Sequence, residues 1–242
     1  MNKDCIRLKG YAVIEEIFTP EEVDLIAEKI MLTNSSKPTF RKTNDLFAVR
    51  QFLKEVPEVQ PIIFNTKLNA IITEYFGPDY FVVKSIYFDK PDHSNWFVAW
   101  HQDLTISVDK KLDLPGFGLW TIKQDQYAVQ PPLTILENIF TIRIHLDDTD
   151  EGNGALRVIP GSHLKGIHRY SSNDSGNEEE ICRVKSGGVM IMRPLLQHAS
   201  NRTTSSNRRR VIHIEFSNSK LPKGLAWAEL LKQPVSQLSP AI

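Results

Sequence analysis

Apolar positions recur at helical spacing in the first third of the chain. The segment TPEE at residues 19–22 has the composition of a helix start, with a hydroxyl cap, a proline in the first turn and a glutamate three residues after the cap. The apolar residues from Val23 to Ile30 then follow at the spacing of one helix face. A second helix is predicted over residues 65–76, because its apolar residues share one face and Gly77-Pro78 would end it.

After residue 78 the pattern changes to short strands separated by turn signals. In residues 139–146, Thr141, Arg143 and His145 alternate with apolar residues and therefore share one face of a strand. Other segments with the composition of strands are residues 80–88, 97–101, 155–159, 189–192 and 209–216. Short strands without an alternating β–α order predict a mainly β fold with N-terminal helices, of the double-sheet jelly-roll, cupin-like type.

These patterns predict a single domain over residues 1–242, in which a helical part, residues 1–78, packs on a jelly-roll core, residues 79–218. Two stretches interrupt the strand pattern. Residues 104–138 form a long segment with several prolines and glycines, and residues 171–180 are rich in polar side chains. Long loops in compact domains are usually lids or binding loops. We therefore expect residues 104–138 to cover the functional site.

The composition excludes several classes of function. The 242 residues include 29 basic and 29 acidic side chains, so the formal net charge is +0, which disfavours bulk nucleic-acid binding. No apolar run approaches the ~20 residues that span a bilayer. We expect no secretory signal, and we expect Cys5 and Cys182 to be reduced thiols of a cytoplasmic protein. Neither a nucleic acid nor a membrane is expected as a partner, and the oligomeric state cannot be inferred from the composition.

The tripeptide His101-Gln102-Asp103 is the first candidate for chemistry. Residues two apart on a strand project to the same side, so an imidazole and a carboxylate can bind one metal ion there. A third ligand from a distant strand would complete the facial triad of non-haem iron(II) enzymes, which leaves positions open for a cosubstrate and dioxygen. A solvated polar turn is the alternative interpretation of this tripeptide taken alone.

Five later histidines are candidates for the third ligand. They are His145, His163, His168, His198 and His213. His198 follows the strand-like run of residues 189–196, and a strand end at the mouth of a barrel is a favourable place for a ligand. The residue types alone favour His198 only slightly over His213.

A dicarboxylate cosubstrate would need a cation, and arginine binds a carboxylate through two parallel hydrogen bonds. The run Arg208-Arg209-Arg210 follows His198 and opens the last predicted strand, and at least one of these side chains is expected to be solvated. Alternation places Arg209 on the more polar face with His213. Ser200 is a candidate for an additional hydroxyl contact to the same carboxylate.

Several motifs together resemble the phytanoyl-CoA dioxygenase family. They are His101-Gln102-Asp103, the run from Asp147-Asp148 to Asn153-Gly154-Ala155-Leu156, Pro160-Gly161-Ser162-His163, and His198-Ala199-Ser200 through Arg209. The resemblance extends from about Gly10 to Phe216, and the order, spacing and flanking residues of the motifs all match. It implies a double-stranded β-helix fold and an oxygenase that depends on iron(II), 2-oxoglutarate and dioxygen.

The resemblance also implies roles for single residues. His101, Asp103 and His198 match the metal ligands, Arg209 matches the arginine that binds the distal carboxylate of 2-oxoglutarate, and Ser200 matches its hydroxyl partner. It thereby favours His198 over His213. Halogenating relatives lack the carboxylate ligand, so the presence of Asp103 favours hydroxylation or a related oxidation.

The substrate is not identified by these motifs. Lys84, Trp120, Lys123 and Arg143 are candidates for contact with it, and the three cations among them suggest an anionic small molecule. Lys84 could instead extend to solvent, and Arg143 with His145 could form a structural pair with a buried carboxylate. A metal-binding or sensory module without turnover, and a cupin-type metalloenzyme that does not use 2-oxoglutarate, are the alternative functions.

Overall fold

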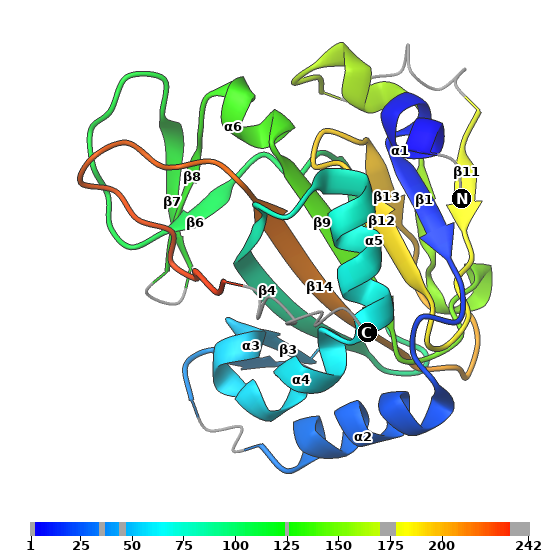
Figure 1. Ribbon diagram of the computed structural model, residues 1–242. Coiled ribbons are helices and arrows are strands. Elements are labelled where there is room, and N and C mark those ends of the chain that lie inside the picture. Colours follow the sequence, from blue (N-terminus) through cyan, green and yellow to red (C-terminus); the bar gives the residue numbers. More distant parts are fainter. Residues whose placement is uncertain (1–2, 34–36, 44–46, 124–125, 170–177, 233–242) are drawn as a thin grey trace, which may run out of the picture.

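The computed structural model describes residues 3–33, 37–43, 47–123, 126–169 and 178–232 (Figure 1). Its main body consists of a seven-stranded sheet in the order β1-β12-β9-β14-β4-β3-β2 and a four-stranded sheet in the order β11-β10-β13-β5. A third sheet, β6-β8-β7, projects from one end. The architecture is the jelly roll that the strand pattern predicted.

Strand pairing is antiparallel in all three sheets. The seven-stranded sheet contains β1 (Tyr11–Ile14), β12 (Val189–Met192), β9 (Ile139–His145), β14 (Arg209–Ser217), β4 (Phe81–Lys90), β3 (Phe47–Arg50) and β2 (Phe40–Lys42). The four-stranded sheet contains β11 (Glu180–Cys182), β10 (Leu156–Val158), β13 (His198–Ser200) and β5 (Val98–His101). The three-stranded sheet contains β6 (Ile106–Val108), β8 (Gln126–Gln130) and β7 (Gly118–Lys123).

Both predicted helices are present, with the predicted starts. The α-helices are α1 (Lys3–Lys9), α2 (Pro20–Met31), α3 (Phe52–Glu55), α4 (Gln60–Ile63), α5 (Thr66–Phe76) and α6 (Leu133–Glu137), and the short 3-10 helices are η1 (Pro57–Val59), η2 (Glu151–Asn153) and η3 (Ser162–Lys165). Thr19 and Glu22 form the capping box of α2, and the Asn65 side chain accepts from the Leu68 amide at the start of α5. These caps satisfy amide groups that a helix start leaves unpaired.

Alternation in the central strands decides which face of the large sheet is apolar. Ile142 of β9 and Ile212 of β14 face outward and belong to one buried cluster with Leu68 of α5, which lies across this face of the sheet (Figure 1). The opposite face of the same strands carries Arg143 and His213. The polar residues of these strands therefore point into the space between the sheets, where a functional site can be enclosed.

The two main sheets pack face to face at one end of this space. Leu156 and Val158 of β10 form a buried cluster with Met190 and Met192 of β12. All four residues are at most 7% exposed, so the sheets exclude water here. This apolar contact closes one end of the barrel and leaves the other end for polar residues.

Two predictions about the fold were incomplete. The N-terminal third is not only helical, because it contributes β1, β2 and β3 to the seven-stranded sheet. Residues 104–138 are not an irregular loop: they form the three-stranded sheet and α6, and these pack around a second apolar cluster that includes Val83 of β4 and Trp227. Most of the polar stretch at residues 171–180 lies outside the described residues.

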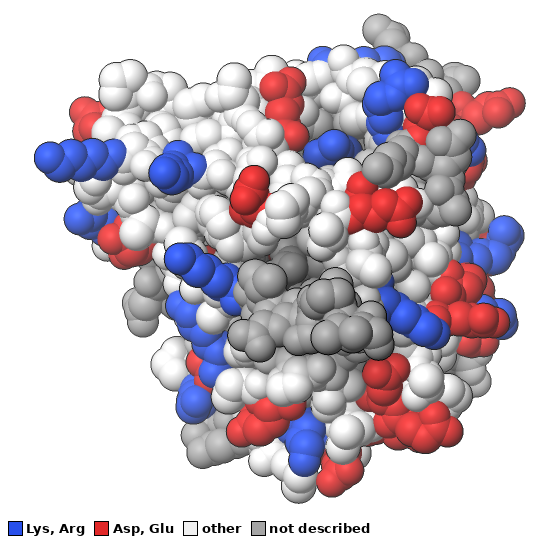
Figure 2. Space-filling model, viewed as in Figure 1, with Lys and Arg blue, Asp and Glu red and all other residues white. Residues whose placement is uncertain are grey.

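The surface carries charges of both signs. In the face drawn in Figure 2, acidic and basic side chains are interspersed. Among the described residues, no helix combines the length and the apolar character required to cross a bilayer.

Candidate metal centre and active site

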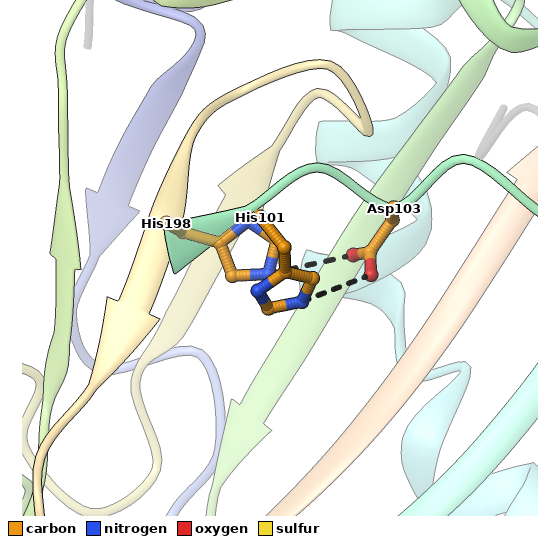
Figure 3. A group of neighbouring side chains, drawn as sticks. All are labelled: His101, Asp103 and His198. Carbon is orange, nitrogen blue, oxygen red and sulfur yellow. Dashed lines mark ion pairs between the residues drawn. The ribbon is translucent and has the colours of Figure 1, made fainter. Parts of the chain in front are cut away.

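His101, Asp103 and His198 come together at one point of the four-stranded sheet. His101 is the last residue of β5 and His198 is the first residue of β13, and the two are direct partners in the antiparallel pairing of these strands. Asp103 follows β5, and its amide donates to the carbonyl of Pro194 at 2.9 Å. One potential ligand atom from each residue lies within 4.8 Å of the other two (Figure 3).

The position of His198 differs from the prediction in one respect. The run of residues 189–196 does not continue as a single strand to His198. β12 ends at Met192, and His198 begins β13 in the other main sheet. The histidine therefore reaches the site because the chain crosses between the sheets after β12.

Backbone contacts orient both imidazole rings in the same way. The Nδ1 atom of His101 lies 2.9 Å from the carbonyl of Ala99, and Nδ1 of His198 lies 2.9 Å from the carbonyl of Leu196. A carbonyl only accepts, so Nδ1 carries the proton in each ring and Nε2 offers a lone pair. Each Nε2 lies 3.7 Å from a carboxylate oxygen of Asp103. Three ligand atoms thus point at a common position.

The charge states favour cation binding. Burial lowers the pKa of His198 to about 4, although Asp103 opposes this shift. Burial alone would raise the pKa of Asp103, but the attraction of His198, His101 and nearby cations outweighs it and holds that pKa well below its usual range. At neutral pH the site presents an ionised carboxylate beside an unprotonated His198.

This donor set fits iron(II). Two imidazole nitrogens and one carboxylate oxygen on a single side are the facial triad of non-haem iron(II) oxygenases, and the remaining positions are available to other ligands. Among the described residues, this is the only group of three or more histidine, cysteine or acidic side chains close enough to share one metal ion.

A cavity of about 290 Å³ adjoins the triad. It lies between the two main sheets and is lined by both. The lining residues are Lys84, Ile86, Phe88, Trp96, Val98, His101, Asp103, Arg143, Leu156, His198, Ser200, Arg209, His213 and Glu215. The lining combines charged and apolar side chains, so it offers both polar partners and apolar contacts to a bound ligand.

Arg209 is a buried cation in this cavity. Its side chain is 3% exposed, and Nη1 donates to the carbonyl of Gly154. Burial, with a contribution from Arg143, lowers its pKa to about 9, so the guanidinium remains charged at neutral pH. No carboxylate pairs with Arg209 among the described residues, which leaves donors of its planar fork available to a ligand.

The Asn153-Gly154 motif positions the carbonyl that contacts Arg209. Asn153 holds the turn through its side chain, which donates to the Asp148 carbonyl at 2.7 Å. Gly154 adopts φ +80°, and a Cβ at this position would lie only 2.7 Å from both the Asn201 carbonyl oxygen and Nζ of Lys90. A side chain here is therefore excluded by both the backbone conformation and the contacts.

The neighbours of Arg209 have other partners. Arg208 forms an ion pair with Asp89, and Arg210 forms one with Asp147 at 2.6 Å. Neither lines the cavity, whereas Arg209 does. The predicted register of this strand is therefore confirmed: Arg209 shares the inward face with His213.

Ser200 also faces the cavity. It lies two residues beyond His198 on β13 and is 2% exposed. Its hydroxyl is buried and has no hydrogen-bond partner among the described residues. A buried hydroxyl without a partner is costly, and a ligand would supply one.

The predicted substrate residues divide into two groups. Lys84 and Arg143 line the cavity beside the triad. Trp120 does not, because it belongs to β7 and packs against the apolar cluster of the three-stranded sheet. Lys123 lies at the end of the same strand, and its side chain is outside the described part of the structure. None of the described residues between 104 and 138 lines the cavity, so the structure does not place the described part of this segment over the metal position.

Glu215 was missed from the sequence. It lies on β14 two residues after His213, so the alternation that placed Arg209 and His213 inward also placed Glu215 there. The sequence signal that could have identified it was a carboxylate on the inward face of a central strand.

The predicted pairing of Arg143 with His145 is not found. Arg143 contacts His213 instead, and Nδ1 of His145 lies 2.8 Å from the Thr149 hydroxyl.

Sequence comparisons identify the relatives of this chain. A family model described as Phytanoyl-CoA dioxygenase (PhyH) matches residues 6–211. A curated protein of Stutzerimonas stutzeri, named "Probable alpha-ketoglutarate-dependent hypophosphite dioxygenase", is 22% identical, with 86% of this chain and 75% of that protein covered.

Solved structures show the same fold. EctD from S. alaskensis matches with a TM-score of 0.68 and 18% identity, over 89% of this chain and 75% of that one. HygX from Streptomyces hygroscopicus, solved with nickel and 2-oxoglutarate, matches with a TM-score of 0.63 and 15% identity, over 90% of this chain and 87% of that one.

Proposed function

Since this chain belongs to the phytanoyl-CoA dioxygenase family of iron(II)- and 2-oxoglutarate-dependent oxygenases, we propose that it hydroxylates a small molecule at a metal held by His101, Asp103 and His198. The observation that carries this proposal is the convergence of two Nε2 atoms and one carboxylate beside a cavity that contains an unpaired arginine. Bound iron would supply the activation of dioxygen, coupled to decarboxylation of 2-oxoglutarate.

The protein's part in this reaction is to bind and orient. Arg209 would bind the distal carboxylate of 2-oxoglutarate through its planar fork, and the Ser200 hydroxyl would donate to the same group. The Gly154 carbonyl, which accepts from Nη1, would hold the guanidinium in place. Because Arg209 and Ser200 are at most 3% exposed, these contacts would be stronger than at a surface.

The triad favours hydroxylation over halogenation. Asp103 would supply the carboxylate of the triad, so no ligand of the protein would be missing there. The backbone amide of Asp103 donates a hydrogen bond to the Pro194 carbonyl, and this bond holds the segment that carries Asp103 in place. The apolar lining residues, such as Val98 and Leu156, would keep water away from the reacting C–H or similar bond.

The cavity favours a small substrate. Its volume of about 290 Å³ lies at the lower limit of ligand pockets, which commonly measure ~300–1,000 Å³. 2-Oxoglutarate must share this space with the substrate. The relative named as a hypophosphite dioxygenase would act on a substrate of this size, and the lining cations favour an anion.

Succinate formation tests the proposal. Purified protein with iron(II), 2-oxoglutarate and ascorbate is expected to release succinate, and His198→Ala and Asp103→Ala are expected to abolish this. His93→Asn is a matched control, because His93 is exposed and does not line the cavity. Binding of 2-oxoglutarate without succinate in the presence of candidate substrates would indicate a sensory module. Absence of 2-oxoglutarate binding would indicate a metalloenzyme of another kind.

A further inference from the structure

We propose that Arg143 binds the anionic group of the substrate, and that this substrate is a small oxyanion such as a phosphinate, phosphonate or carboxylate. The inference rests on the function proposed above and specifies the chemical class of its substrate. Arg143 lies in the middle of β9, is 7% exposed, and lines the cavity that also contains the metal triad.

A chain of hydrogen bonds defines what Arg143 can do. Its Nη1 lies 3.1 Å from Nδ1 of His213, and Nε2 of His213 lies 3.1 Å from Glu215. Arginine only donates, so Nδ1 of His213 must accept. The proton of His213 is then on Nε2 and is donated to Glu215. Arg143 is thus held in place by a neutral acceptor and keeps its full charge.

Lys84 is already neutralised by this arrangement. Its ammonium donates to Glu215 at 2.7 Å, and the side chains are 17% and 5% exposed. Burial alone would raise the pKa of Glu215, but Lys84 and His213 outweigh it and lower that pKa. Glu215 is therefore ionised and is the counter-ion of Lys84. Of the two predicted substrate cations that line the cavity, Lys84 is a positioning residue and Arg143 is the available one.

A count of charges leaves Arg143 without a counter-ion. The cavity is lined by three cations, Lys84, Arg143 and Arg209, and by two carboxylates, Asp103 and Glu215. Glu215 pairs with Lys84. Iron(II) and Asp103 would together carry one positive charge, and the 2-oxoglutarate dianion and Arg209 would together carry one negative charge. These two charges cancel. One positive charge remains, and it is on Arg143.

The unpaired charge is also an unsatisfied donor. Nε of Arg143 is buried and has no hydrogen-bond partner among the described residues. Burial lowers the pKa of Arg143 to about 10, with Asp103 acting in the opposite direction, so the side chain is still protonated at neutral pH. A buried cation without a partner is unfavourable. An oxyanion would supply both the charge and the acceptors that it lacks.

The location of Arg143 suits a substrate rather than the distal end of the cosubstrate. In the proposed function Arg209 and Ser200, on β14 and β13, would supply the contacts for the distal carboxylate. Arg143 instead contacts His213, which lies beside Glu215 and Lys84, and all four line the cavity together with Asp103. An anion bound by Arg143 would therefore lie near the metal ligands, where a small substrate must lie to react.

Calorimetric titrations of the full chain loaded with nickel(II) and 2-oxoglutarate test this assignment. The probes are hypophosphite, methylphosphonate and acetate, with acetamide as a neutral control. At least one anion is expected to bind, whereas acetamide is not. Arg143→Met and Arg143→Gln are expected to weaken binding of that anion on the order of 100-fold. Arg143→Lys is expected to recover part of the affinity, because it restores the charge without the fork.

Affinity for 2-oxoglutarate separates the possible outcomes. In the Arg143 variants it should stay within about threefold of wild type, which also shows that they are folded. Loss of 2-oxoglutarate binding in these variants would assign Arg143 to the cosubstrate and overturn the proposal. So would equal binding of the anion to wild type and Arg143→Met, or failure of all three anions to bind. Failure of the wild type to bind 2-oxoglutarate would instead refute the proposed function.

Discussion

Lys90 and Arg209 are direct partners in the antiparallel pairing of β4 with β14, so two buried cations lie next to one another at the edge of the active site. Their exposed fractions are 1% and 3%. Nζ of Lys90 donates to the Asn201 carbonyl at 2.6 Å, and no acidic side chain pairs with it among the described residues. Burial and the charge of Arg209 lower the pKa of Lys90 to about 7.

This shift predicts a pH-dependent stability. Between pH 7 and the ordinary lysine pKa of 10.5, the unfolded chain binds a proton at Lys90 that the folded protein does not. The free energy of unfolding therefore rises with pH in this window. Below pH 7 Lys90 is charged in both states, and the unfavourable burial of its charge is fully present. Lys90→Met removes the effect. In urea unfolding at pH 6.5 and 8.5, the free energy of unfolding of the wild type should increase relative to that of the variant as the pH rises. A constant difference would contradict the assignment.

Arg209 is expected to determine the affinity for 2-oxoglutarate. Loss of a charge-assisted, two-point contact to this buried side chain should cost about 2–4 kcal/mol, or roughly a 30- to 1,000-fold weaker complex for Arg209→Ala. Arg209→Lys should recover only part of this loss. The charge-transfer band of the anaerobic iron complex measures the affinity.

Arg208→Ala is the matched control for that series. Arg208 is half exposed and pairs with Asp89 outside the cavity, so its loss should change 2-oxoglutarate affinity by ~0–1 kcal/mol. Normal binding by Arg209→Ala would remove this residue from the cosubstrate site.

Gly154→Ala should impair both stability and cosubstrate binding. The new Cβ would lie 2.7 Å from the Asn201 carbonyl and from Lys90, so the turn that presents the Gly154 carbonyl to Arg209 would have to move. Gly161→Ala is the control, because its φ of +77° is similar but its Cβ would meet only the Leu8 carbonyl at 3.4 Å. We expect about 1 kcal/mol of destabilisation for Gly161→Ala and clearly more for Gly154→Ala. Equal losses, with unchanged 2-oxoglutarate affinity, would show that the contacts of Gly154 are unimportant.

Lys84 and Glu215 should be coupled in stability. Lys84→Met leaves Glu215 as a buried carboxylate without its cation and is expected to destabilise the protein by about 3 kcal/mol. The double variant Lys84→Met/Glu215→Gln should recover most of this, because the amide oxygen still accepts from Nε2 of His213. Denaturant unfolding of the wild type, Lys84→Met, Glu215→Gln and the double variant gives the coupling energy directly. Additive effects would mean that the two side chains do not depend on one another.

Local sequence patterns determined the two longest helices, several strands of the jelly-roll core and the inward face of β14. The spacing of the TPEE cap specified the start of α2, and alternation in residues 209–216 placed Arg209 inward and its two neighbours elsewhere. These features depend on the periodicity of a helix or a strand, which a few adjacent residues are enough to reveal. The motif HQD likewise placed His101 and Asp103 at one point, because both belong to one short segment.

Features that depend on pairing between distant segments were decided only by the tertiary structure. The sheet made by residues 104–138 was not evident, because its strands are stabilised by an apolar cluster with Val83 and Trp227. The pairing of His198 with His101 joins strands almost a hundred positions apart, and the Lys84–Glu215 ion pair joins β4 to β14. Residue types identified Lys84 and Arg143 as cations near the site. The strand register decides which of them has a carboxylate opposite it, because a shift of one residue turns a side chain to the other face of the sheet.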